Sequence, residues 1–177
     1  GETEAIKDLS LNVSEGEFIS IVGPSGCGKS TLLSLICGLL KPSSGKILIG
    51  GEEVTGPSVK TGYMFQKDHL FEWRTIIENV MLGLEITKTL NKSTKSYVIK
   101  LLETYGLAEF KDKYPSQLSG GMRQRAALIR TLAINPQILL LDEALSALDY
   151  QTRLAVTEDI YSIIKRENKT ARVRISA

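Results

Sequence analysis

The sequence lacks several features that define common classes of protein. No apolar run approaches the roughly 18 residues that a membrane-spanning helix needs, and the N-terminus shows no basic-then-apolar signal sequence. Cysteine is scarce, since Cys27 and Cys37 are too few for a disulfide framework or a metal cluster. These absences favour a protein of the cytoplasm.

An excess of charge of one sign is also missing. The chain has 22 lysines and arginines against 20 acidic residues, a net charge of +2. No large electric field therefore favours nucleic acid or an acidic membrane surface as a partner. The length of 177 residues and the hydrophobic content of 42% suit a single globular domain with a sizeable core.

Residues 23–31 match the phosphate-binding loop pattern G-x-x-x-x-G-K-[ST] at every fixed position. The apolar run 18–22 precedes the loop as a buried strand would, and residues 32–36 follow it as a helix. Glycines let successive N–H groups point inward around an anion, and the helix N-terminus adds its positive dipole end. The alternative is a glycine-rich turn that precedes a helix.

In such a loop the Lys29 ammonium would neutralise the β- and γ-phosphates of a nucleotide, and the Ser30 hydroxyl would bind Mg²⁺. The residues expected to contact phosphate are Gly23, Pro24, Ser25, Gly26, Cys27, Gly28, Lys29, Ser30 and Thr31.

Short strand patterns surround the loop. Residues 5–13 alternate apolar and polar side chains as a half-buried strand does, and 46–49 read as a strand that ends at the Gly50-Gly51 turn. These strands predict a small antiparallel flank. Residues 61–65 are a further strand candidate that ends at Gln66.

Beyond Gln66 the pattern becomes helical. Thr75 and Glu78 form a capping box, and a second helix is predicted from Lys95 to Tyr105, stopping at Gly106. We therefore expect residues 67–133 to form a helical subdomain inserted into an α/β core made of 1–66 and 134–177.

A continuously apolar run, Ile138–Leu141, predicts a strand covered on both faces of a parallel sheet. Asp142 and Glu143 follow at its carboxyl end, where open α/β sheets bind ligands. Beside a phosphate loop, Asp142 would orient the Mg²⁺ shell and Glu143 would polarise a water for attack on the γ-phosphate. Alone, the pair could equally be an ordinary strand end. A last helix is predicted over 149–168, with Leu154, Ile160, Ile163 and Ile164 facing inward.

A second anion-binding element is predicted at Ser119, Gly120 and Gly121, which offer a hydroxyl and bare N–H groups at a helix start. Alone, this stretch could be an ordinary serine-capped helix. Together with the loop, the chain resembles the ATP-binding cassette (ABC) ATPases, and the resemblance covers essentially all of it. The matching stretches, in the family's order and spacing, are 23–31, Gln66, 118–125, 138–143 and 146–149.

The resemblance implies a P-loop NTPase (RecA-like) core and a transporter ATPase that binds ATP and Mg²⁺. It further implies a head-to-tail homodimer, in which Lys29 of one chain and Ser119 of the other hold the same γ-phosphate. Gln66 would join Asp142 and Ser30 around Mg²⁺, Glu143 would be the general base, and Asp149 would cross the dimer interface. The run 65–73 with 78–80 looks most like importers of nitrate, sulfonate or taurine.

Two expected residues of the family are missing from these 177 residues. No aromatic residue precedes Phe18 to stack on adenine, and the sole histidine, His69, lies too early to contact the γ-phosphate. Residues 170–177, with two arginines among Val and Ile, fit an edge strand. We therefore expect a cassette shortened at both ends that hydrolyses ATP poorly, and we expect His69 to be a surface or subunit-contact side chain.

Two other classes compete with a transporter subunit. One is a cassette ATPase acting on nucleic acid, but no long coiled coil, zinc module or basic excess supports it. The other is a nucleotide-bound structural subunit. For a transporter, separate membrane-spanning permease subunits are implied, so the chain would be peripheral on the inner face of the membrane. Their docking surface is expected near Gln66–Trp73, where Leu70, Phe71 and Trp73 would be exposed unless they pack inside the helical subdomain.

Overall fold

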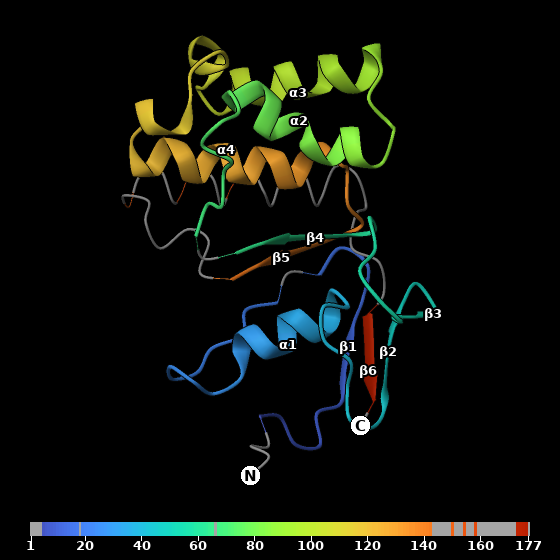
Figure 1. Cartoon of the computed structure of the whole chain (residues 1–177). Helices are drawn as coiled ribbons and strands as arrows, with labels where there is room; N and C mark the ends of the chain where they lie inside the picture. Colours follow the sequence, from blue (N-terminus) through green and yellow to red (C-terminus); the bar gives the residue numbers. More distant parts are fainter. Residues whose placement is uncertain are drawn as a thin grey trace.

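The computed structural model describes residues 5–17, 19–65 and 67–142, the helical positions 150, 154 and 158, and the backbone of 173–176. At its centre, strands β4 (Thr61–Met64) and β5 (Ile138–Leu141) pair in parallel, with Thr61 opposite Ile138 and Met64 opposite Leu141 (Figure 1). The strand predicted at 138–141 is confirmed, and its pairing brings together segments more than 70 residues apart in sequence.

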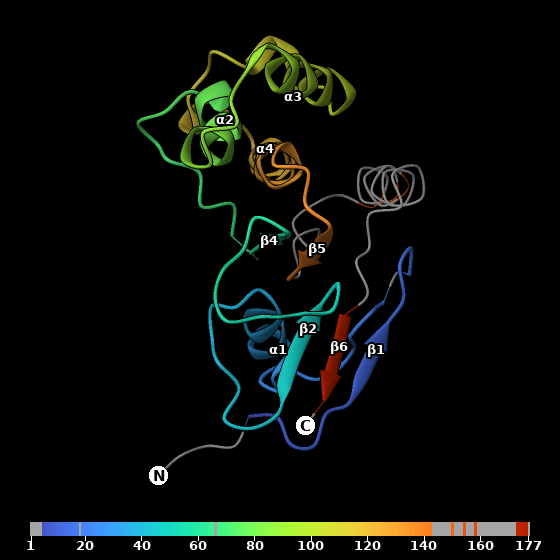
Figure 2. The ribbon, with the colours of Figure 1, turned by 90° about the vertical axis from the view of Figure 1, so that its right-hand side faces the viewer.

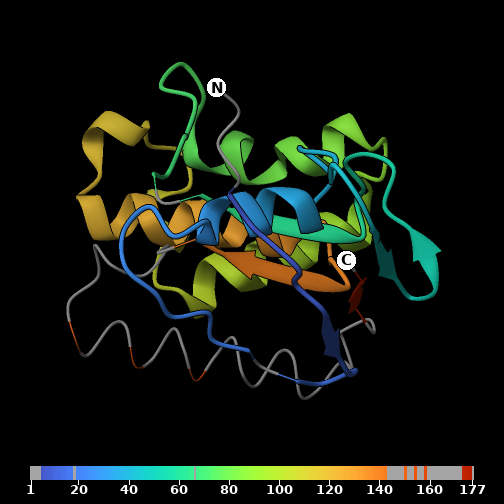
Figure 3. The same ribbon diagram turned by 90° about the horizontal axis from the view of Figure 1, so that it is seen from below.

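Two apolar clusters cover the two faces of this strand pair. Ile138 and Leu140 belong to a cluster with helix α1 (Lys29–Ile36), whereas Leu139 and Leu141 pack against a cluster built from helices later in the chain. Seen from below, α1 lies over the strand pair (Figure 3). Because both faces are covered, every residue of β5 can be apolar, which explains the unbroken Ile-Leu-Leu-Leu run.

Residues 19–22 differ from the prediction of a buried strand. They form no strand, and Ile19, Ile21 and Val22 are exposed, Val22 by 90%. A buried strand needs a ladder partner and apolar cover, and within the described residues the ladders of the central pair join only β4 and β5. The apolar sequence alone therefore does not produce a strand here.

The antiparallel flank has the strand order β1-β6-β2-β3, with β1 (Leu11–Val13), β6 (Val173–Ser176), β2 (Lys46–Ile49) and β3 (Glu52–Glu53). Figure 2 shows β2, β6 and β1 side by side. The strand predicted over 5–13 is shorter, because Asp8 has a positive φ of 48° that interrupts extended backbone. The edge position expected for 170–177 is wrong, since β6 pairs with β1 on one side and β2 on the other.

Helices dominate the stretch from 76 to 133. They are α2 (Ile76–Ile86), α3 (Lys92–Thr104), two short 3₁₀ turns (Ala108–Phe110 and Pro115–Gln117) and α4 (Gly120–Ala133). Helix α3 begins three residues before the predicted start, because Asn91 accepts from the backbone N–H groups of Ser93 and Thr94 and caps it there. Helix α4 lies against the β4–β5 pair on the face opposite to α1 (Figure 1).

The last predicted helix is described at three positions. Tyr150, Leu154 and Glu158 are helical and exposed. Four-residue spacing places them on one face, so Leu154 faces solvent rather than the interior as predicted. Ile160, Ile163 and Ile164 lie outside the described residues.

The mixed architecture of helices and sheets confirms the predicted α/β class.

The capping box of α2 gives a first testable prediction. Thr75 accepts from the Glu78 N–H, while the Glu78 carboxylate accepts from the Thr75 N–H and hydroxyl, both at 2.8 Å. We expect Thr75→Ala to lower the free energy of unfolding by about 1 kcal/mol, measured by urea titration. These hydrogen bonds lower the pKa of Glu78 below 4.5. The stabilisation of the folded state by the ionised Glu78 carboxylate is therefore present above that pH and is lost as pH falls through the lowered pKa.

Thr104→Ala is the matched control, because the exposed Thr104 hydroxyl donates to the Lys100 carbonyl inside α3 and caps no helix. It should leave stability unchanged or slightly raised, since alanine is the better helix former. An equal loss in the two variants would contradict the capping role of Thr75.

Candidate nucleotide-binding site

The phosphate-loop residues form an open turn at the start of α1. Gly28 occupies the N-cap position with φ of 94°, and no side chain caps the helix. The first N–H groups of α1 therefore keep their positive end available to an anion. A Cβ atom at Gly28 would lie 2.8 Å from the Ala5 carbonyl oxygen, so glycine is required there both for backbone conformation and for space.

Lys29 folds back over this turn. Its ammonium donates to the carbonyl oxygens of Gly23 at 2.7 Å and Pro24 at 2.8 Å, and lies 3.8 Å from the Cys27 sulfur. A fixed positive charge thus lies over the loop, next to the uncapped helix start. The chemistry of this arrangement suits a polyphosphate.

Tyr63 and Asp142 meet where the two parallel strands end. The Tyr63 hydroxyl donates to an Asp142 carboxylate oxygen at 3.2 Å, and the Asp142 N–H extends the ladder by donating to the Met64 carbonyl. Burial is the largest cause that raises the pKa of Tyr63 to about 12. The prediction that Asp142 lies at the carboxyl edge of the sheet is confirmed, whereas Tyr63 was not predicted as a site residue.

Ser30 and Asp142 offer the kinds of donor that an Mg²⁺ site needs. Ser30 in the first turn of α1 supplies a hydroxyl, and Asp142 supplies a carboxylate, the oxygen ligands that Mg²⁺ prefers alongside water and phosphate. Within the described residues, no group of three acidic, histidine or cysteine side chains could hold a metal alone. Phosphate and water would therefore complete the Mg²⁺ shell.

Three of the predicted functional residues lie outside the described residues. Gln66 and Glu143, with the interface residue Asp149, have no described placement. Their neighbours are described: Phe65 precedes Gln66 at the end of β4, and Asp142 precedes Glu143 at the end of β5.

The second predicted anion-binding element, made of Ser119, Gly120 and Gly121, is at a helix start, as expected. Ser119 is the N-cap of α4 and its hydroxyl accepts from the Met122 N–H at 3.3 Å, with Gly120 and Gly121 in the first turn. Within the described residues, no hydrogen bond or ion pair joins this turn to residues 23–31. The β4–β5 pair lies between α4 and α1 (Figure 1).

Two arginines of α4 hold the segment after Gln66, and the sequence did not reveal them. Arg123 forms an ion pair with Asp68 at 3.1 Å, and Arg130 donates to the carbonyl oxygens of Asp68 at 2.6 Å and His69 at 2.7 Å. His69 has a positive φ of 46°. The Arg130 fork therefore fixes an unfavourable backbone conformation and ties this segment to the helix that begins at Ser119.

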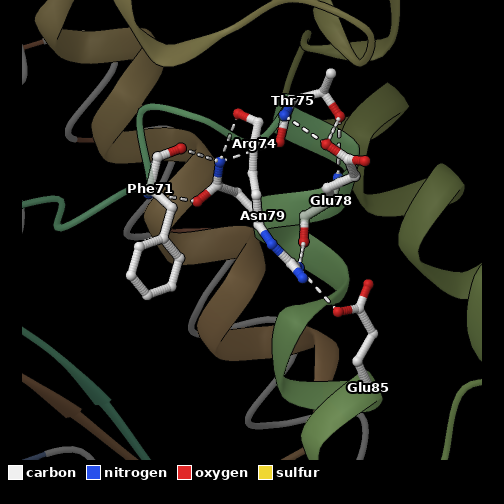
Figure 4. A network of polar contacts seen from close by, with 6 residues as sticks. All are labelled: Phe71, Arg74, Thr75, Glu78, Asn79 and Glu85. Carbon is white, nitrogen blue, oxygen red and sulfur yellow. Dashed lines mark hydrogen bonds and ion pairs between the residues drawn. The ribbon is translucent and has the colours of Figure 1, made fainter.

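Asn79 fixes the next part of the same segment (Figure 4). This side chain is fully buried; it accepts from the Phe71 N–H at 2.7 Å and donates to the carbonyls of Phe71, Arg74 and Thr75, each at 3.0 Å. As a result Leu70 is buried, Phe71 is half-buried and Trp73 is 73% exposed. The expected exposure is thus correct for Trp73 and wrong for Leu70, which packs in the helical cluster.

Three features occur together here: a glycine loop with its lysine, a helix start without a side-chain cap, and parallel strands that end in an aspartate. Together they define a P-loop nucleotide-binding cassette. Residues 6–146 match the family model described as ABC transporter, and the chain belongs to that family. This confirms the resemblance inferred from the motifs.

Similar proteins agree with this assignment. The chain is 51% identical over 170 residues to the uncharacterized ABC transporter ATP-binding protein YtlC of Bacillus subtilis, covering 96% of this chain and 65% of that protein. It is 42% identical over 167 residues to the taurine import ATP-binding protein TauB of Roseobacter denitrificans, covering 94% and 62%. The chain thus spans under two thirds of the length of these curated relatives.

A solved structure gives the same fold. It is a dimeric post-hydrolysis state of the ATP-binding cassette MJ0796 bound to ADP and Pi, with a TM-score of 0.84 and 35% identity over 94% of this chain and 77% of that one. Among the described residues, no helix has the length and apolarity to cross a membrane.

Two of the three glycines of the loop give a second prediction. Gly26 and Gly28 both have positive φ, but a Cβ at Gly26 meets nothing within 4 Å, whereas one at Gly28 meets Ala5. We expect Gly26→Ala to lower the free energy of unfolding by about 1 kcal/mol, the cost of left-handed backbone in an L-residue. Gly28→Ala should lose clearly more, as measured by urea titration. Equal losses would show that the Ala5 contact does not constrain the loop.

Proposed function

We propose that this chain is the ATP-binding and ATP-hydrolysing part of an ABC transporter. The observation that carries the proposal is the start of α1, which is free of a side-chain cap and lies under the Lys29 ammonium. The positive charge of Lys29 and of the helix start would attract the negative phosphates of a nucleotide. An ordinary glycine turn would not supply this binding energy.

Each site residue then has a role. Loop residues 23–31 bind the phosphates through N–H groups and Lys29, while Ser30, Asp142 and Gln66 hold or orient the Mg²⁺ shell. Mg²⁺ supplies charge neutralisation to the phosphates when bound. Glu143 accepts a proton from the attacking water, which is why a carboxylate is needed directly after Asp142.

We further propose that the site is completed by a second copy arranged head to tail, with Ser119, Gly120 and Gly121 meeting the γ-phosphate of the partner's nucleotide. Two observations support it. In a single chain the β4–β5 pair lies between the phosphate loop and this turn (Figure 1), and the related MJ0796 cassette is dimeric. The proposed division into a core of 1–66 with 134–177 and a helical subdomain of 67–133 is supported by the apolar cluster built mainly from α2, α3 and α4, which meets the core at Met64, Leu139 and Leu141.

Nucleotide binding and dimer formation are tested together with two variants. Lys29→Ala should weaken ATP binding at least tenfold, measured by fluorescence of an ATP analogue, because the ammonium has no other cationic substitute in the loop. Glu143→Gln should retain ATP binding, lose phosphate release and sediment as a dimer in MgATP but as a monomer without it. Association of equal strength without ATP would contradict the proposed nucleotide-bridged dimer.

The partner is proposed to be a membrane permease that docks on the segment Gln66–Trp73, placing this chain peripherally on the inner face of the membrane. The support is the exposed Trp73 side chain on a backbone fixed by Asn79 and Arg130. A rigid segment with an exposed aromatic anchor binds with little loss of conformational entropy. A small anionic solute such as nitrate, sulfonate or taurine is proposed as the cargo, supported by the likeness to TauB.

Docking is tested by substituting the exposed aromatic. Trp73→Ala should reduce copurification of the full-length protein with its membrane subunits by tenfold or more, as expected for an interface anchor. ATP binding should stay at the wild-type level. Ile86→Ala is the control, because Ile86 is 72% exposed, close to the 73% of Trp73, yet lies at the far end of α2. Equal copurification of the two variants would place the permease elsewhere.

A further inference from the structure

Tyr63 connects two strands through its hydroxyl. It lies in β4 opposite Leu140 of β5, and its hydroxyl reaches diagonally to Asp142, two residues further on the same face, at 3.2 Å. The acceptor is one carboxylate oxygen of Asp142, Oδ2. A single hydrogen bond thus restricts the rotation of the carboxylate that the proposed function places in the Mg²⁺ shell.

The surroundings hold this hydroxyl in place. The Ser34 hydroxyl of α1 is a further hydrogen-bonding neighbour of the Tyr63 hydroxyl. The ring lies 4.4 Å from that of Phe65, which in turn meets His69 edge-on at 5.5 Å. The ring contacts and the Ser34 hydroxyl therefore restrict the orientation of the Tyr63 side chain.

The contact with Ser34 extends the link to the phosphate-loop helix. Ser34 lies in α1 four residues after Ser30, so the two hydroxyls share a face of the helix. The aromatic ring also packs against the apolar cluster that contains Leu32, Leu33 and Ile36 of α1. Tyr63 thus touches the helix that carries one proposed Mg²⁺ ligand and hydrogen-bonds to the residue that supplies the other.

We propose that Tyr63 is a positioning residue for the metal site: its hydroxyl holds Oδ2 of Asp142 and directs the other carboxylate oxygen toward the Mg²⁺ shell beside Ser30. The proposal rests on the proposed function, because it needs Asp142 to act in metal binding. Outer-shell hydrogen bonds of this kind alter metal affinity about 10- to 100-fold when they are removed.

The test compares nucleotide affinity with and without metal in the full-length protein. The measured quantity is the ratio of the Kd for a non-hydrolysable ATP analogue in EDTA to its Kd in saturating Mg²⁺. We expect Tyr63→Phe to lower this ratio by about tenfold while leaving the Kd in EDTA unchanged. With Mn²⁺ in place of Mg²⁺, the electron paramagnetic resonance spectrum of the bound ion should also change.

Tyr97→Phe is the matched control. Tyr97 lies in α3 and packs against the helical cluster, away from Asp142. The substitution therefore removes the same hydroxyl group without affecting a contact to Asp142. It should keep the wild-type ratio and spectrum. Wild-type values in Tyr63→Phe, or a loss of affinity in EDTA as large as the loss in Mg²⁺, would overturn the positioning role.

Asp142→Asn distinguishes the proposed metal role of Asp142 from the proposed positioning role of Tyr63. A lowered ratio in Asp142→Asn with a wild-type ratio in Tyr63→Phe would overturn the role of Tyr63 and support the proposed metal role of Asp142. A wild-type ratio in Asp142→Asn would overturn both. Lowered ratios in both, with Tyr97→Phe unchanged, support the proposal.

Discussion

The parallel pairing of β4 with β5 is the constraint on which the rest of the structure depends. It joins residues 61–64 to 138–141, and each face of the pair carries one of the two apolar clusters. The same ladder sets which residues meet at its carboxyl end: Tyr63 lies diagonal to Asp142 because Tyr63 is opposite Leu140. A slip of one residue in either strand would turn the side chains of that strand to the opposite face and separate Tyr63 from Asp142, so the core and the site depend on one register.

A second set of contacts joins helix α4 to the segment after Gln66. Arg123 and Arg130 of α4 hold Asp68 and His69, and Asn79 of α2 holds the backbone from Phe71 to Thr75. Most of the acceptors in these contacts are backbone carbonyls. Burial lowers the pKa of Arg130, and the negative charge of Asp68 opposes that change. Breaking such part-buried bonds costs more than breaking solvent-exposed ones, so the start of α4 and the proposed docking segment are expected to move together.

The sequence predicts best those features whose cause is local. The loop 23–31, the capping box of Thr75 and Glu78 and the apolar strand 138–141 each depend on residues adjacent in sequence, and the structure contains all three. The strand expected at 18–22 depends on distant partners, and β6 lies between β1 and β2 because of pairing that alternation of side chains does not specify. Arg130 and Asn79 were missed because backbone carbonyl acceptors carry no sequence signature. A polar Asn79 among Ile76, Ile77, Val80 and Met81 was the available signal.

The contacts of Lys29 determine how a nucleotide would be bound. Its ammonium already donates to the Gly23 and Pro24 carbonyls, so the side chain is ordered over the loop rather than extended into solvent. Binding would exchange these neutral acceptors for phosphate oxygens, so that the ammonium faces negative charge and the Coulomb attraction between opposite charges is added to the hydrogen bonds. The net gain is therefore the difference between two sets of bonds, and little conformational entropy is lost because the lysine is already held. A preformed loop of this kind favours a ligand with several negative charges, since one charge would compensate poorly for the two carbonyls released.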